Sequence, residues 1–222
     1  MERWQGTGMH VLIYDDRPMA AEGPKRLLEQ QSGYVVTVAE DHDDPVSTTS
    51  KVDPDIILLN VGLRIGEGLR LIHALREALA TIPILVLSSH PEAILAERIV
   101  RAGANGYLML NEAPDRLTEA LHQAGSGGTY LSRAMRQSIL QKIRDPTLAG
   151  QHQGLDGLSD RELEVFQLIG RGYNTQEVAT TLHLSAKTIA THRAHIKKKL
   201  DLTNNTVLIN VAARQILADK AE

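Results

Sequence analysis

One stretch near the C-terminus concentrates basic side chains. Between residues 185 and 200 the chain has no Asp or Glu but has five cationic residues: Lys187, Arg193, Lys197, Lys198 and Lys199. Ile189, Ile196 and Leu200 recur at spacings that place them on one face of a helix, so the cations lie largely off that face. Clustered Lys and Arg bind nucleic-acid phosphates because they release condensed counterions. A basic helix that faces only solvent is the alternative interpretation.

A second, shorter helix is predicted just before the basic one. Asn174 and Glu177 have the spacing of a capping box, in which each side chain accepts a backbone N–H of the other residue. His183 and Leu184 supply a turn, and Ser185 can cap the helix that follows. Two capped helices joined by a tight turn are typical of a helix-turn-helix, whose second helix enters the major groove. This pattern favours double-stranded DNA as the partner of the basic helix.

The side chains expected to contact DNA follow from the way such a helix docks. Its N-terminal part approaches base edges, and its flanks approach phosphates. We therefore expect contacts to bases or nearby phosphates from Lys187, Thr188, Thr191 and His192, and contacts to phosphates from Arg193, Lys197, Lys198 and Lys199.

Two neighbouring carboxylates in the N-terminal half suggest a different chemistry. Asp15 and Asp16 directly follow a short apolar run at residues 10–14. Paired carboxylates suit a hard cation such as Mg²⁺, which prefers oxygen ligands. Acidic residues at the end of a strand can equally well do no more than cap the next turn. On these residues alone, both interpretations stay open.

Short apolar runs alternate with helical patterns through the first half of the chain. The runs predict strands at 10–14, 34–39, 55–59, 84–87 and 106–109, and the patterns predict helices at 18–31, 68–79, 92–102 and 114–124, with a short helix possible after Pro45. Such alternation indicates a parallel sheet with helices on both faces, in which sites lie at the carboxyl ends of the strands. Asn60, Ser88 and Leu110 follow three of these strands and should share one edge with Asp15.

Composition narrows the class of protein. The chain has 222 residues, a net charge of −3 and no cysteine, which excludes disulfides and thiolate metal sites. No apolar run is long enough to cross a membrane, and the first residues lack the apolar core of a signal peptide, so we expect a cytoplasmic protein. Residues 156–222 hold nine Lys or Arg against eight Asp or Glu, whereas the remainder holds fifteen against nineteen. The basic character is therefore local to one helix.

Glycines and a proline mark the boundary between two predicted domains. Gly125-Ser-Gly-Gly128 interrupts the helical pattern, and Asp145-Pro146 ends a further helix predicted at 132–144. Residues 147–157 contain three glycines, which is typical of a flexible linker. We expect domains at 9–125 and 156–222, joined by a helix-containing linker at 126–155.

Several of these stretches are motifs of a known family. The C-terminal part reads LSDRELEVFQLIGRGYNTQEVATTLHLSAKTIATHRAHIKKKLDLTNNT, and the N-terminal part contains IYDDRP, DIILLNVGL, ILVLSSH and AGANGYLML. On these motifs the chain resembles bacterial response regulators of the NarL/FixJ family. The resemblance implies an α/β receiver-like (flavodoxin-like) domain with a five-stranded parallel sheet, followed by an all-α LuxR-type helix-turn-helix domain of four helices. It also implies a transcription regulator of a two-component system that binds DNA as a homodimer. The last helix dimerises the output domain in this family, and Val207 and Val211 suit that contact, with ordinary packing within the domain as the alternative.

Two positions depart from the family pattern in the receiver-like domain. Asn60 stands where the family has its phosphoacceptor aspartate, and Leu110 stands where it has a lysine. An amide is not a carboxylate nucleophile and contributes no charge for Mg²⁺, and a leucine cannot pair with a phosphoryl group. Ser88 and Tyr107 retain the hydroxyl and the aromatic ring that the family uses in its switch. We interpret this edge as a degenerate phosphorylation pocket that aspartyl phosphorylation does not switch.

The input to such a receiver stays open. The domain could sequester a regulatory protein, or it could bind a nucleotide such as cyclic di-GMP, because Tyr130-Leu-Ser-Arg133 resembles a motif that begins with Trp and ends with Arg in some family members. An enzyme is not expected, since the histidines are scattered and no nucleophile–base pair is visible. We expect no cofactor and no metal beyond weak cation binding at Asp15 and Asp16.

Overall fold

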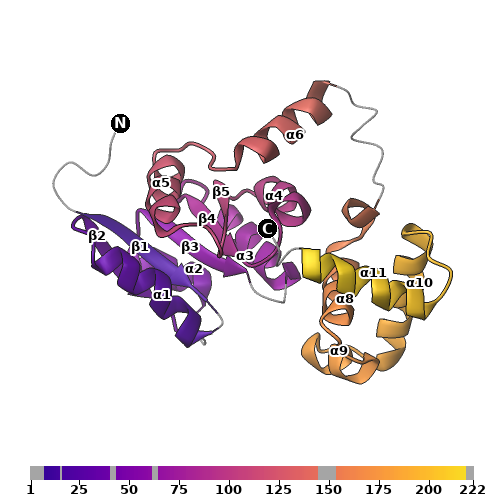
Figure 1. The fold of residues 1–222 in the computed structure, drawn as a ribbon. Helices are drawn as coiled ribbons and strands as arrows, with labels where there is room; N and C mark the ends of the chain where they lie inside the picture. Colours follow the sequence, from indigo (N-terminus) through magenta and orange to yellow (C-terminus); the bar gives the residue numbers. More distant parts are fainter. Residues whose placement is uncertain (1–7, 16, 41–43, 62–64, 145–153, 219–222) are drawn as a thin grey trace. The chain divides into compact units, whose positions relative to one another are not determined.

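The computed structural model describes residues 8–15, 17–40, 44–61, 65–144 and 154–218. The chain forms two compact units (Figure 1). Most of the chain up to Ile139 belongs to the first unit, and the residues from Leu140 onward belong to the second. Asp16 and most of the predicted flexible linker lie outside the described residues. Within the described part of the chain, no helix is long and apolar enough to cross a membrane.

The first unit contains a five-stranded sheet in the order β2-β1-β3-β4-β5, and every strand pair is parallel. The strands are β1 (Met9–Tyr14), β2 (Tyr34–Val38), β3 (Ile56–Val61), β4 (Ile84–Ser88) and β5 (Gly106–Met109). The predicted parallel sheet is therefore confirmed. One strand end was misplaced: β3 continues through Asn60, which pairs with Leu87, to Val61. Asn60 thus lies inside the strand rather than after it.

Helices cover this sheet: α1 (Pro18–Glu29), α2 (Pro45–Val52), α3 (Ile65–Ala78), α4 (Glu92–Arg101) and α5 (Pro114–Gly125). Proline begins α1, α2 and α5. Proline suits the first helical position because its fixed φ is helical. Its lack of an N–H costs no hydrogen bond there, since a backbone N–H at that position has no acceptor within the helix. Asp44 caps α2 by accepting the backbone N–H of Ser47 at 2.8 Å, so the short helix after Pro45 is present.

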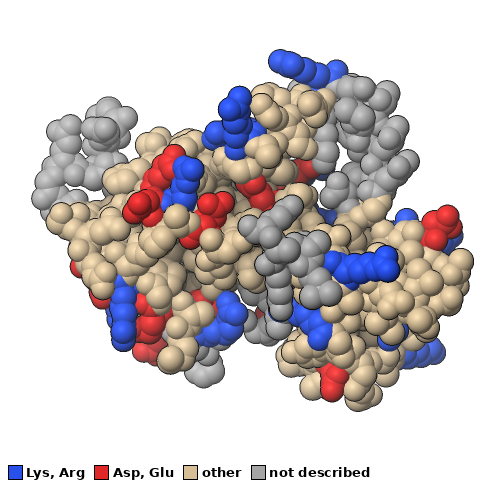
Figure 2. All heavy atoms as spheres, viewed as in Figure 1, with Lys and Arg blue, Asp and Glu red and all other residues tan. Residues whose placement is uncertain are grey.

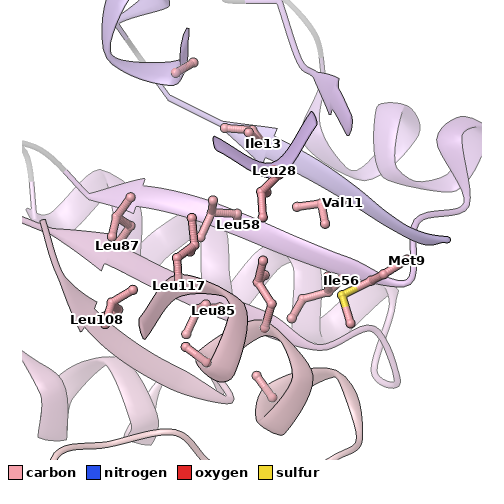
Figure 3. Packing of buried hydrophobic residues seen from close by; sticks show 14 residues of the cluster. Met9, Val11, Ile13, Leu28, Ile56, Leu58, Leu85, Leu87, Leu108 and Leu117 are labelled. Carbon is pink, nitrogen blue, oxygen red and sulfur yellow. The ribbon is translucent and has the colours of Figure 1, made fainter. Parts of the chain in front are cut away.

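The core of the first unit lies on both faces of the sheet. Val11, Leu58 and Leu85 are buried on one face against Leu28 of α1 and Leu117 of α5 (Figure 3). Because side chains alternate along a strand, the intervening buried residues point to the opposite face. Burial on both faces explains why these strands are continuous apolar runs rather than alternating patterns.

Arg76 at the end of α3 fastens a loop to the sheet. Its Nε donates to the carbonyl of Gly103 at 2.6 Å, and its Nη2 donates to Oδ1 of Asn105 at 2.6 Å. Its Nη1 donates to the carbonyls of Ala80 and Ile82 at 3.2 and 2.5 Å. Gly103 has a φ of +110°, and a Cβ there would lie 2.8 Å from Cγ of Arg76. Backbone conformation and space both require the glycine in this motif.

The chain after α5 continues the sheet edge. Tyr130 forms a parallel bridge with Gly106: its carbonyl accepts the N–H of Tyr107, and its N–H donates to the carbonyl of Asn105, both at 2.9 Å. Glu92 then accepts the N–H of Ser132 at 2.7 Å, just before α6 (Arg133–Arg144). The first compact unit therefore extends past residue 125, where the sequence pattern placed its end.

The second unit is helical. After a 3₁₀ turn η1 (Gly154–Gly157) it contains α8 (Asp160–Gly170), α9 (Thr175–Thr181), α10 (Ala186–Lys199) and α11 (Asn205–Ala218). Its small core is formed by fully buried apolar side chains that include Phe166 of α8, Ile189 and Ile196 of α10, and Leu208 of α11. The predicted combination of an α/β receiver domain and a four-helix domain is confirmed.

Candidate nucleic-acid interface and receiver pocket

The helix-turn-helix is built by local capping. Asn174 Oδ1 accepts the N–H of Glu177 at 3.0 Å, and the Glu177 carboxylate accepts the N–H of Asn174 at 2.7 Å, so the predicted capping box is confirmed. Ser185 Oγ accepts the N–H of Thr188 at 3.0 Å and caps α10. Between the helices His183 adopts a left-handed conformation with φ +53°, which turns the chain.

α10 presents a polar stripe on its outward side. Ile189 and Ile196 are completely buried, whereas Lys187, Thr191 and Lys198 are exposed. These three residues are spaced by four and seven positions, so the helical period places them in one row. In the view of Figure 2, basic and acidic atoms are interspersed on the first unit, whereas acidic atoms are sparse on the second. The structure thus gathers three of the eight predicted contact residues.

Other predicted contact residues are engaged within the domain. The Thr188 hydroxyl lies 2.8 Å from Ser185 Oγ, and Nη1 of Arg193 donates to Oγ1 of Thr175 in α9 at 2.9 Å. His192 is half-buried, and within the described residues its Nδ1 has no hydrogen-bond partner. Desolvation lowers the pKa of His192, which favours the neutral form of the ring. Lys197 is half-buried at the edge of the stripe.

Glu162 of α8 connects two helices through one carboxylate. Its Oε2 accepts the N–H of Ser159 at 2.7 Å and the Lys199 ammonium at 2.6 Å, and its Oε1 lies 3.7 Å from Nδ1 of His195. Burial by itself would raise the pKa of Glu162, but Lys199 and Ser159 outweigh it and hold the pKa below its ordinary value. The Ser159–Glu162 capping box joins residues that are close in sequence. The pairing with Lys199 instead depends on how α8 and α10 cross.

Replacing Lys199 with methionine is expected to move acid unfolding to higher pH. A carboxyl whose folded pKa is depressed contributes stability above its unfolded pKa of about 4.3 and loses it as the pH falls through the folded value. Without the ammonium the pKa of Glu162 should rise, so this loss begins at higher pH. Circular dichroism during acid titration measures the midpoint. Lys198→Met, at an exposed position, is the control and should leave the midpoint unchanged.

In the described part of the predicted degenerate phosphorylation pocket, Asp15 bonds to neighbouring side-chain and backbone groups. Nδ2 of Asn60 donates to Oδ2 of Asp15 at 2.5 Å. Oδ1 of Asp15 accepts the backbone N–H of Arg17 at 2.9 Å, and the Arg17 Nε lies 3.5 Å away. The Asp15 carboxylate therefore has an amide and a guanidinium beside it. Among the described residues, no group of three or more His, Cys, Asp or Glu side chains could hold a metal ion.

The remaining pocket residues point in different directions. Ser88 is buried, and its hydroxyl donates to the carbonyl of Val61 at 2.7 Å. Tyr107 is buried, and its hydroxyl donates to the carbonyl of His90 at 2.5 Å; desolvation raises the pKa of this phenol. Leu110, in contrast, is 42% exposed. The switch hydroxyl and ring are thus held inside the domain, while an apolar side chain faces outward where the family has a cation.

The residues predicted to contact a second subunit or a nucleotide differ in how exposed their side chains are. On α11, Val211 is exposed and Val207 is half-buried, and the exposed Ile209 was not anticipated because it falls outside the predicted pair. In the Tyr130–Arg133 stretch, Leu131 is buried and the Tyr130 backbone is bonded to the sheet edge. Tyr130 and Leu131 therefore contribute to the fold of the first unit. Of the two end residues of the motif, Tyr130 is half-buried and Arg133 is exposed.

The chain is similar to known proteins over both units. Residues 11–122 match the response regulator receiver domain, and residues 156–212 match the bacterial regulatory proteins of the luxR family. The oxygen regulatory protein NreC of Staphylococcus carnosus is 29% identical over 95% of this chain and 100% of NreC. The nitrate/nitrite response regulator NarL of Escherichia coli is 30% identical over 86% of this chain and 89% of NarL. RcsB of Salmonella enterica serovar Typhimurium, solved bound to the promoter rprA with BeF3⁻, has a TM-score of 0.61 and 25% identity, covering 93% of this chain and 99% of RcsB.

Proposed function

Because this chain belongs to the NarL/FixJ-family response regulators and is a transcriptional regulator, we propose that it binds DNA without being switched by aspartyl phosphorylation. The observation that carries this proposal is the hydrogen bond from Asn60 to Asp15. An amide stands where a carboxylate would attack a phosphodonor, and it satisfies the acidic partner that would otherwise hold a cation.

The switch residues support the same proposal. Ser88 and Tyr107 are hydrogen-bonded inside the domain to backbone carbonyls of Val61 and His90. Both groups are therefore already satisfied without a phosphoryl group, and Leu110 offers no cation to bind one. The relatives NreC and NarL are themselves regulatory proteins, which agrees with a regulatory role for this chain.

DNA recognition is assigned to α10. Lys187 and Thr191 lie on its exposed stripe near the N-terminal end, which is the end that reaches base edges in a docked recognition helix. Lys198 lies further along the same stripe and would contact phosphate. Thr188, His192, Arg193 and Lys197 border this surface. We expect a homodimer on a two-fold operator in the cytoplasm, with Val207 and Val211 of α11 at the contact between subunits.

Genomic DNA provides the test of the proposal. The purified, unmodified chain is mixed with fragmented genomic DNA at near-physiological salt, and the retained fragments are sequenced with and without prior incubation with acetyl phosphate and Mg²⁺. We expect the same few palindromic sites in both samples and an unchanged protein mass. Phosphodonor-dependent enrichment, or a mass gain of one phosphoryl group in the receiver, would contradict phosphorylation independence.

Replacing Lys187 with alanine is expected to weaken binding to the enriched operator by about 1–3 kcal/mol, because a base contact is lost. Fluorescence anisotropy with a labelled operator duplex measures the change. Lys51→Ala, at an exposed position of α2 in the receiver domain, is the matched control and should bind as the unaltered chain does. An unchanged isotherm for Lys187→Ala would reject the proposed docking of α10.

A receiver that binds a regulatory partner is the second candidate function. Leu110, which is 42% exposed after β5, offers an apolar contact to such a partner where the family has a lysine. A nucleotide such as cyclic di-GMP is the other ligand class. Calorimetric titration of the purified chain with cyclic di-GMP separates the two, because heat of binding would favour the nucleotide.

A further inference from the structure

Lys199 stands apart from the other cations of α10. Its ammonium lies 2.6 Å from Oε2 of Glu162, and the Glu162 side chain is only 5% exposed while that of Lys199 is 42% exposed. The contact joins the last turn of α10 to the first turn of α8. The cation is thus partly in solvent, whereas its anionic partner is almost completely enclosed.

Glu162 cannot follow Lys199 toward a ligand. Its Oε2 also accepts the N–H of Ser159 at 2.7 Å, so the carboxylate is held at the N-terminus of α8. If a DNA phosphate took Lys199 away, it would leave a buried carboxylate without its cation. Removing the cation from a carboxylate that is only 5% exposed is unfavourable, because the enclosed negative charge loses its partner.

We propose that Glu162 is a positioning residue for DNA recognition, which withholds Lys199 from phosphate and uses it to anchor the last turn of α10 to α8. This inference rests on the proposed function, in which the stripe of α10 contacts DNA. Lys187 and Thr191 then read the operator from a helix whose orientation is fixed by the protein itself. Non-specific binding, which depends on the number of cations that reach phosphates, is smaller by one contact.

The substitution Glu162→Gln tests the role of the negative charge separately from the role of the cap. A capping box accepts either Glu or Gln at this position, so Glu162→Gln can keep the bond to the Ser159 N–H while losing the negative charge. The variant should release Lys199 to solvent and to phosphates. We expect stronger binding to DNA of unrelated sequence and weaker discrimination of the operator, since the anchor of α10 is lost.

The experiment measures the salt dependence of binding for the full-length chain on a duplex of unrelated sequence, by fluorescence anisotropy. The variants are Glu162→Gln, Lys199→Met and the double substitution. We expect Lys199→Met to leave the slope of log K against log salt unchanged. We expect Glu162→Gln to steepen it by about 0.9, the effect of one added phosphate contact, and the double substitution to reverse that gain.

Lys198→Met is the control, because Lys198 lies on the exposed stripe and should lose about 0.9 from the slope in either background. A flatter slope for Lys199→Met in the otherwise unaltered chain overturns the inference, as does an unchanged slope for a folded Glu162→Gln. If Glu162→Gln does not fold, the comparison of Lys199→Met with Lys198→Met still decides. Failure of the unaltered chain to bind any duplex overturns the proposed function together with this inference.

Discussion

Replacing Arg76 with alanine is expected to lower the free energy of unfolding of the first unit by about 3–4 kcal/mol, because hydrogen bonds from a charged donor are individually strong and the part-buried carbonyls of Gly103 and Ile82 lose theirs. The guanidinium donates to the carbonyls of Gly103, Ala80 and Ile82 and to the side chain of Asn105. Oδ1 of Asn105 also accepts the backbone N–H of Ile84 at 3.1 Å and keeps that bond once the Arg76 side chain is removed. Desolvation lowers the pKa of Arg76, yet a guanidinium remains charged at neutral pH.

Urea denaturation monitored by circular dichroism measures this loss. Arg70→Ala is the matched control, since Arg70 is an exposed residue of the same helix, and it should change stability by less than about 0.5 kcal/mol. Arg76→Lys should recover only part of the stability because an ammonium cannot reproduce a planar fork of donors. Equal midpoints for Arg76→Ala and Arg70→Ala would show that the four bonds do not hold the loop.

Replacing Asn60 with aspartate is expected to destabilise the first unit by about 2–4 kcal/mol at neutral pH, since two carboxylates forced together raise one pKa by roughly two to three units. Nδ2 of Asn60 now donates to Asp15 at 2.5 Å, and the substitution turns this bond into a repulsion. An amide and a carboxylate have nearly the same shape, so the change isolates charge. The destabilisation is measured by thermal or urea unfolding.

The pH dependence follows from the sign of this shift. A carboxyl whose folded pKa is raised is favoured while protonated, so the penalty is absent below the unfolded pKa of about 3.9 and grows as the pH rises to the folded value. The unaltered chain and Asn60→Asp should therefore unfold alike near about pH 4 and diverge toward neutral pH.

Magnesium supplies a second test of Asn60→Asp. Mg²⁺ binds through one or two carboxylates, so millimolar Mg²⁺ should raise the melting temperature of the variant. The unaltered chain should not respond, because the Asn60 amide already occupies Asp15. A matching rise for the unaltered chain would show that Asp15 binds the cation despite Asn60.

Much of the fold could be predicted because its signals are local. The strands of the parallel sheet are buried on both faces and so appear as unbroken apolar runs, as residues 84–88 illustrate. The predicted end of the third strand, before Asn60, was wrong because a polar residue inside a strand resembles the start of a loop. Only the pairing of Asn60 with Leu87 in the neighbouring strand shows that the strand continues.

In the candidate site, too, contacts between residues close in sequence could be predicted, whereas contacts between distant residues could not. The caps at Asn174 and Ser185 join residues two or three positions apart, so spacing sufficed. Lys199 and Glu162 are 37 positions apart and meet only because α8 and α10 cross. A count of basic residues in α10 therefore assigned Lys199 to phosphate, and nothing in the helical pattern indicated its partner.

The bridge between Tyr130 and Gly106 bears on how the receiver domain should be isolated. A fragment cut at residue 125 would lose Tyr130 and would expose the N–H of Tyr107 and the carbonyl of Asn105, which bond to it at the edge of the sheet. Open strand edges pair with other chains, so such a fragment is prone to self-association. Dimers or precipitates that it forms would then be a product of the cut. A fragment that continues through Ile139 keeps the bridge to Tyr130 and the whole of the first compact unit, so it is the better fragment for measuring the association of the receiver domain.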